Sequence, residues 1–263
     1  MLKKLLKYDL SHIFKFLSIF YFLSIFFGIL TRIFLSIENS HIMNIIGQIC
    51  SGVTISMLFN ILINNLMRLW VRFKHNLYGD ESYLTHTLPI NRKTLYLSKA
   101  ITAIITLFTT ILVIGLTIFV AYYSKENLEI LKNILLPIAS TYTSSIIKIL
   151  LVFLFIFFLE FANILQSGFT GIILGHKMNN FKTAYSALFG FCVYILTQIS
   201  TLLVVFIAAL FNKEIMNLFY TTEIVNISSV KIIIYLAIIS YSILLIILYF
   251  INLRLLKKGV NVD

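Results

Sequence analysis

Six long apolar stretches dominate the sequence and limit the folds that it can adopt. Each is longer than 20 residues and holds at most two charged residues. A helix needs about 20 apolar residues to cross the ~30 Å hydrocarbon core of a membrane, because it rises about 1.5 Å per residue. The stretches cover residues 13–35, 42–66, 100–123, 146–174, 184–211 and 232–253. This pattern predicts an all-α, polytopic membrane protein with six transmembrane helices.

Composition supports the same interpretation. Hydrophobic residues make up 60% of the chain and charged residues only 12%, and the mean hydropathy is +0.98. A soluble chain of this length could not bury so much apolar surface in one core. No segment between the apolar stretches is long enough for a soluble domain. We therefore expect a single transmembrane domain over residues 1–263.

The formal net charge of +11 is distributed in a way that indicates membrane topology rather than a nucleic-acid partner. The basic residues lie between the apolar stretches, where they meet anionic lipid headgroups, and do not form a basic face interleaved with aromatics. If the N-terminus is cytoplasmic, that side holds 15 Lys and Arg residues and the other side six. Lys and Arg concentrate on the cytoplasmic side of membrane proteins, so both termini are expected to be cytoplasmic.

The first twelve residues carry a helical pattern of their own. Leucines at 2, 5, 6 and 10 share one face, and lysines at 3, 4 and 7 share the other, which predicts an amphipathic interfacial helix. The alternative is the polar start of the first span. No small-residue cleavage pattern follows, so we expect the leader to be retained.

Two spans are longer than the membrane requires. The lengths of the stretches 146–174 and 184–211 indicate that each span is tilted, is broken, or includes a half-span that enters the membrane and returns. Cys50 and Cys192 lie in different spans with no metal-type spacing, and we expect free thiols. The five histidines show no ligand spacing and no phosphate-binding glycine motif occurs, so neither a metal site nor an ATP site is indicated.

The connection over residues 68–99 is the most specific part of the sequence. Gly79 can end one helix, the acidic pair Asp80 and Glu81 suits the start of another, and Pro89 stops it. Asn91 can then cap the helix that continues into the third span. The sequence predicts a short cytoplasmic helix at about 80–88, which could transmit force from a partner or be an ordinary capped loop helix.

This connection resembles the corresponding stretch of type 2 ABC transporter permeases, the membrane subunits of bacterial exporters. Twelve residues match the family pattern of an acidic pair, a Y-L-T-x-T-L-P run, a basic turn and a final S-K pair: Gly79, Asp80, Glu81, Tyr83, Leu84, Thr85, Thr87, Leu88, Pro89, Arg92, Ser98 and Lys99. The basic C-terminal tail, LRLLKKGVNVD, is also similar, although Gly259 and Val260 depart from the commoner lysine-leucine run.

The resemblance implies a permease that is not itself an enzyme. The short helix would be a coupling helix seated on a separate nucleotide-binding subunit, which would bind ATP and Mg²⁺. A second permease copy, identical or diverged, would complete an exporter of drugs, lipids or antimicrobial peptides in the bacterial cytoplasmic membrane. Carried over by position, the contact with the ATPase would comprise Asp80, Glu81, Tyr83, Leu84, Leu88 and Pro89.

Glu160 is the one acidic residue deep within a predicted span. A charge there is costly, so it should face the bundle interior, take up a proton or pair with a polar group such as Gln198 or Asn60. Asn163 and Ser167 continue the same small and polar side, followed by Gly168, Gly171 and Gly175. This side predicts either a substrate path, with Glu160, Asn163 and Ser167 lining it, or close helix packing with Glu160 as an interhelical hydrogen-bonding group.

Two other classes of function stay open from the residues alone. One is a stand-alone membrane protein, such as a peptide-immunity protein or an ion-coupled carrier, although a carrier usually has charges in several spans. The other is a membrane-embedded enzyme, which would need a cluster of reactive side chains at one depth, and no such cluster is visible.

Overall fold

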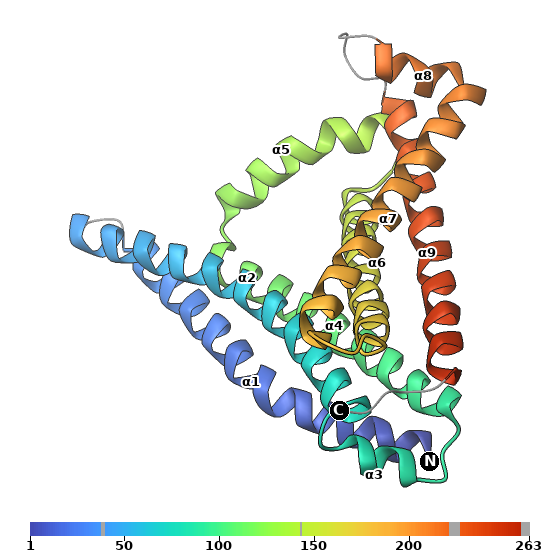
Figure 1. Ribbon diagram of the computed structural model, residues 1–263. Coiled ribbons are helices and arrows are strands. Elements are labelled where there is room, and N and C mark those ends of the chain that lie inside the picture. The colour runs from blue at the N-terminus through green and yellow to red at the C-terminus, as the bar shows by residue number, and fades with distance from the viewer. Residues whose placement is uncertain (38–39, 143, 221–226, 259–263) are drawn as a thin grey trace. The chain divides into compact units, whose positions relative to one another are not determined.

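The computed structural model describes residues 1–37, 40–142, 144–220 and 227–258 (Figure 1). Throughout these ranges the regular structure is α-helical, and no strand occurs in them. The helices are α1 (Leu2–Leu35), α2 (His41–Leu77), α3 (Ser82–Thr87), α4 (Arg92–Tyr122), α5 (Lys125–Thr141), α6 (Ile146–Gly175), α7 (Lys182–Phe211), α8 (Lys213–Tyr220) and α9 (Ile227–Lys257).

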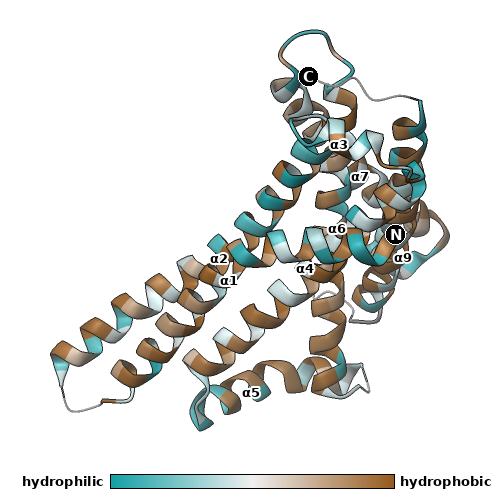
Figure 2. Ribbon diagram, turned by 90° about the horizontal axis from the view of Figure 1, so that it is seen from below, coloured by the Kyte–Doolittle hydropathy of each residue, from teal (hydrophilic) through white to brown (hydrophobic). Residues whose placement is uncertain are grey.

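Six of these helices are long and apolar enough to cross a membrane, as the sequence predicted. Within the described residues they are α1, α2, α4, α6, α7 and α9. Large hydrophobic side chains stay exposed along them, among them Phe22, Phe59 and Phe206 at 69%, 65% and 51%. Figure 2 shows hydrophobic residues along most of the length of the long helices. Apolar surface on this scale requires lipid, so the protein is a multi-pass membrane protein.

The chain forms two compact units. The first comprises Met1–Asn76 and Tyr83–Glu129, and its long helices are α1, α2 and α4. Hydroxyl and amide side chains form hydrogen bonds between these helices. Thr110 contacts both Tyr21 of α1, at 2.8 Å, and Asn65 of α2, at 2.9 Å. Ser51 of α2 contacts Tyr122 of α4 at 2.7 Å.

The second unit comprises Leu77–Ser82 and Ile130–Asp263, and α6 packs against both α7 and α9. Glycines allow α6 and α7 to approach closely. A Cβ atom added at Gly171 would lie 2.4 Å from the backbone of Gly190, and one at Gly175 would lie 2.4 Å from the backbone of Ser186. Small residues serve this role in membrane helices because the backbones can then touch.

Several details differ from the expectations. α6 and α7 are each one continuous helix, so the predicted break or return does not occur. The leader 1–12 is continuous with the first span in α1, in agreement with the alternative that it is the start of that span. The segment that follows the third span, which the sequence did not predict to be helical, forms α5, a helix of 17 residues. The final tail residues, including Gly259 and Val260, lie outside the described residues.

Candidate functional site

The connection between α2 and α4 folds as its sequence predicts. The Gly79 carbonyl accepts a hydrogen bond from the Ser82 backbone N–H at 2.8 Å, which turns the chain into α3. α3 ends at Thr87, before Pro89. The Asn91 side chain then accepts from the Lys93 backbone N–H at 3.0 Å, so Asn91 is the N-cap of α4. α3 lies within the predicted range 80–88 but is shorter than that range.

α3 presents apolar side chains to its surroundings. Tyr83 and Leu84 are 67% and 73% exposed, and Leu88 is 46% exposed. Asp80 and Pro89 are also exposed, whereas Glu81 is half-buried. Five of the six residues assigned to a partner contact are therefore exposed, and they lie in one short segment. Exposed aromatic and aliphatic side chains on a polar loop are typical of a protein interface.

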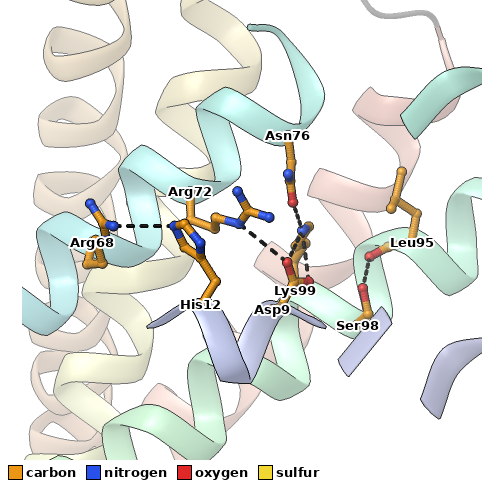
Figure 3. Close-up of polar contacts among 8 residues, drawn as sticks. All are labelled: Asp9, His12, Arg68, Arg72, Asn76, Leu95, Ser98 and Lys99. Atoms are coloured by element: carbon orange, nitrogen blue, oxygen red, sulfur yellow. Dashed lines mark hydrogen bonds and ion pairs between the residues drawn. The ribbon is translucent and has the colours of Figure 1, made fainter. Parts of the chain in front are cut away.

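A buried ion cluster lies in the first unit, where α2 ends and α4 begins (Figure 3). The Lys99 ammonium donates to both carboxylate oxygens of Asp9, at 2.7 and 2.8 Å. It also donates to the Asn76 side-chain oxygen. The Arg72 Nε atom lies 3.6 Å from the same carboxylate. Asp9, Arg72 and Lys99 are only 1%, 5% and 6% exposed.

A second layer of contacts continues this cluster along α1 and α2. An Arg68 guanidinium nitrogen lies 3.3 Å from the His12 Nε2 atom. The same guanidinium lies 4.7 Å from the centre of the Phe16 ring, and that of Arg72 lies 5.0 Å from the centre of the Tyr8 ring. Arginine over an aromatic face gains cation–π attraction. The leader is thereby held to α2.

The cluster holds together the two ends of the connection that carries α3. Asn76 is the residue before the last of α2, and Lys99 lies in the second turn of α4. Lys99 binds the Asp9 carboxylate of α1, and Asn76 binds Lys99. Removing one member of a buried ion pair strands the other charge and typically costs about 3–5 kcal/mol. The ends of the α3 connection are therefore fixed to a rigid base within the first unit.

Glu160 joins three helices in the second unit. The Tyr194 hydroxyl and the Gln198 amide of α7 both donate to one Glu160 carboxylate oxygen, each at 2.8 Å. The Tyr241 hydroxyl of α9 donates to the Gln198 side-chain oxygen at 2.9 Å. Gln198 was predicted as a partner and is one. Asn60, the other candidate, is exposed and bonds with Asn64 on its own helix.

The residues that follow Glu160 on the same side of α6 are packed. Asn163 is fully buried, and its amide donates to the backbone oxygens of Leu159, at 3.0 Å, and of Tyr241, at 3.1 Å. Ser167 is 1% exposed. Gly171 meets the backbone of α7. Asn163 and Ser167 are therefore buried in the packed interior of the second unit, and Gly171 lies at the contact of α6 with α7.

The segment that precedes α3 contacts the end of α6 in the second unit. The Tyr78 ring stacks on the His176 imidazole, with ring centres 4.2 Å apart. Both side chains are buried, at 1% and 0% exposure. The His176 Nδ1 atom lies 2.8 Å from the Ile172 carbonyl oxygen, so Nδ1 carries the proton. This contact holds the entry to the connection against the C-terminal end of α6.

Sequence reasoning missed the ion cluster and the Tyr78–His176 stack. Asp9 and Lys99 are 90 residues apart in the chain, and no spacing rule joins them. One signal was available for Asp9: it is the only acidic residue among the first 37. An acidic side chain in an otherwise basic leader needs a cationic partner when another helix packs over it and buries it.

Comparisons of the chain with protein-family models, with curated proteins and with solved structures found no match.

Proposed function

We propose that this chain is the permease subunit of an ATP-driven exporter in the bacterial cytoplasmic membrane. A separate nucleotide-binding subunit would bind ATP and Mg²⁺, and a second permease copy would complete the machine. The cargo would be hydrophobic or amphipathic, such as a drug, a lipid or an antimicrobial peptide. α3 would transmit the motion of the ATPase to the spans.

The observation that carries this proposal is the exposed apolar segment of α3 between two spans. Tyr83 and Leu84 occupy the positions that the family resemblance assigns to the ATPase contact, and they are the two most exposed of the large apolar side chains in α3 and its flanking turns. A partner that buries them would gain about 25 cal/mol per Å² of apolar surface covered. They therefore suit the centre of an interface.

The ion cluster supports the same proposal mechanically. A coupling helix must be rigidly connected to the spans that it moves. Otherwise the motion of the ATPase would only deform the connection and would not reach the spans. The Asp9, Asn76 and Lys99 contacts fix both ends of the α3 connection within the first unit. A force on α3 would thus reach α1, α2 and α4 together.

Copurification with α3 variants tests this function. The chain is coexpressed with a candidate ATP-binding subunit, sought first among the reading frames adjacent to its own, and purified in a mild detergent. Tyr83→Ala with Leu84→Ala should weaken the association about tenfold or more, because truncation of interface hot spots costs about 2 kcal/mol or more. A matched control is Leu131→Ala with Ile134→Ala on α5, where both side chains are also exposed.

The outcomes separate the proposal from its alternatives. Loss of the ATPase with the α3 variant alone, with gel filtration unchanged, supports a coupling contact. Equal binding by the α3 variant and the control would contradict it. Transport or peptide protection by the purified chain without an ATPase would favour a stand-alone carrier or immunity protein.

A further inference from the structure

The second unit contains a groove that the proposed function does not use. Its volume is about 560 Å³, within the range of small-molecule sites. The lining comes from the end of α5, the start of α6 and the start of α9. Of the twelve described residues that line it, seven are aliphatic or phenylalanine and none is acidic.

Two lysines make one end of this groove cationic. Lys148 is the third residue of α6, and Lys231 lies in the second turn of α9. Both side chains are exposed. Phe153 and Tyr235 line the groove about one turn further along the same helices. A cationic end followed by an apolar body matches an amphiphile with an anionic head and a hydrocarbon tail.

The position of the lysines suits a lipid headgroup. Both lie near the helix ends on the side away from the chain termini, because α6 and α9 are the fourth and sixth of six spans. The first turns of α6 and α9, where each helix dipole is positive, both contribute residues to the groove. In the orientation that the charge distribution predicts, this side faces the outer leaflet.

We propose that the groove formed by α5, α6 and α9 binds an anionic phospholipid of the leaflet opposite the chain termini. Its phosphate lies beside Lys148 and Lys231, and its acyl chains run along Phe153 and Tyr235. The charge complementarity selects this occupant over a zwitterionic lipid. The site is separate from α3, so it can be present whether or not the chain couples to an ATPase.

Fluorescence quenching by brominated lipids tests the site directly. Trp70 is the only tryptophan in the sequence, so Trp70→Phe provides a clear background in which Tyr235→Trp reports on the groove. The variant is reconstituted in phosphatidylcholine vesicles that contain brominated phosphatidylglycerol or, at the same fraction, brominated phosphatidylcholine. An indole at position 243, from Ile243→Trp on the exposed side of α9, reports on ordinary boundary lipid.

We expect phosphatidylglycerol to quench the indole at position 235 preferentially, with no such preference at position 243. Lys148→Gln and Lys231→Gln should each lower the preference about fivefold, as expected for one lysine near a lipid phosphate. Lys148→Arg and Lys231→Arg should retain it. A control pair, Lys125→Gln with Lys132→Gln, removes two charges outside the groove lining.

Three results would overturn the proposal. The first is equal quenching by the two lipids at position 235. The second is an equal loss of preference in the control pair, which would indicate general surface charge. The third is weak quenching by both lipids, which would mean that protein, such as a second copy of the chain, covers the groove. Gel filtration of each variant confirms that it is folded.

Discussion

At the scale of single residues, we expect the Asp9–Lys99 ion pair to contribute strongly to the stability of the first unit. Asp9→Asn leaves the Lys99 ammonium buried without a full counter-charge, and should destabilise the protein by about 3 kcal/mol. Lys93→Met is the matched control, because Lys93 is exposed at the start of α4 and exposed charges contribute little. Unfolding in mixed detergent micelles measures both variants.

A double variant separates the ion pair from simple packing. Asp9→Leu with Lys99→Met removes both members of the pair at once, and should be more stable than Asp9→Asn alone. The double variant leaves only the Arg72 guanidinium beside the site, whereas Asp9→Asn leaves both Arg72 and Lys99 without the carboxylate. If Asp9→Asn is as harmless as Lys93→Met, the buried pair is not a structural base for α3.

Glu160 gives a second residue-scale prediction. Tyr194→Phe removes one donor to the Glu160 carboxylate and should cost about 0.6 kcal/mol, the typical value for an interhelical hydrogen bond in a membrane. Tyr185→Phe on the same helix is the control, because Tyr185 is 39% exposed. Glu160→Gln should preserve function, since an amide can also accept from Tyr194 and Gln198. Loss of function with unchanged stability would instead favour the substrate-path interpretation.

Part of the residue-scale picture was predictable from the sequence. The Asn91 cap follows from an Asn after a proline at the start of an apolar helix, which is a local rule. Gln198 as a partner of Glu160 followed from depth alone. The Asp9–Lys99 pair and the Tyr78–His176 stack join residues far apart in the chain, and local rules do not reach that distance.

At the scale of helices, the glycines of α6 determine how closely it packs against α7. Gly171→Ala should destabilise the second unit by about 1–3 kcal/mol, because the added methyl meets backbone atoms that cannot move aside. Gly115→Ala on α4 is the control, since nothing lies within 4 Å of a Cβ there, and it should be neutral or slightly stabilising. Similar effects of the two substitutions on thermal stability would contradict close α6–α7 packing.

The long helices were predictable because length and hydropathy suffice for a span. The helix α5 was not predictable in this way, because the charged residues in its first turns lower the hydropathy of the segment. Leu135 and Ala139 of α5 form a small buried cluster with Ile149 of α6, and this tertiary packing makes the segment helical. α6 continues as a regular helix past Glu160, whose Oε1 atom accepts from both Tyr194 and Gln198.

At the scale of the whole molecule, the exposed helix α3 is joined to long helices that a buried ion cluster holds together. The chain exposes apolar side chains on α3 and places a buried ion cluster where the flanking helices meet. A surface of that kind without a partner would be unfavourable in water. We therefore expect α3 to be covered by the ATP-binding subunit in the assembled transporter.

Site-specific crosslinking from position 84 tests this claim most directly. Both native cysteines are free, so Cys50→Ala with Cys192→Ala provides a background for a single Leu84→Cys, and Ile134→Cys on α5 is the matched exposed control. A thiol-reactive photocrosslinker is attached in the native membrane, and adducts are identified by mass spectrometry. We predict an adduct with the ATP-binding subunit from position 84 and not from position 134. Adducts from neither position, or equally from both, would contradict the assignment of α3 as the coupling helix.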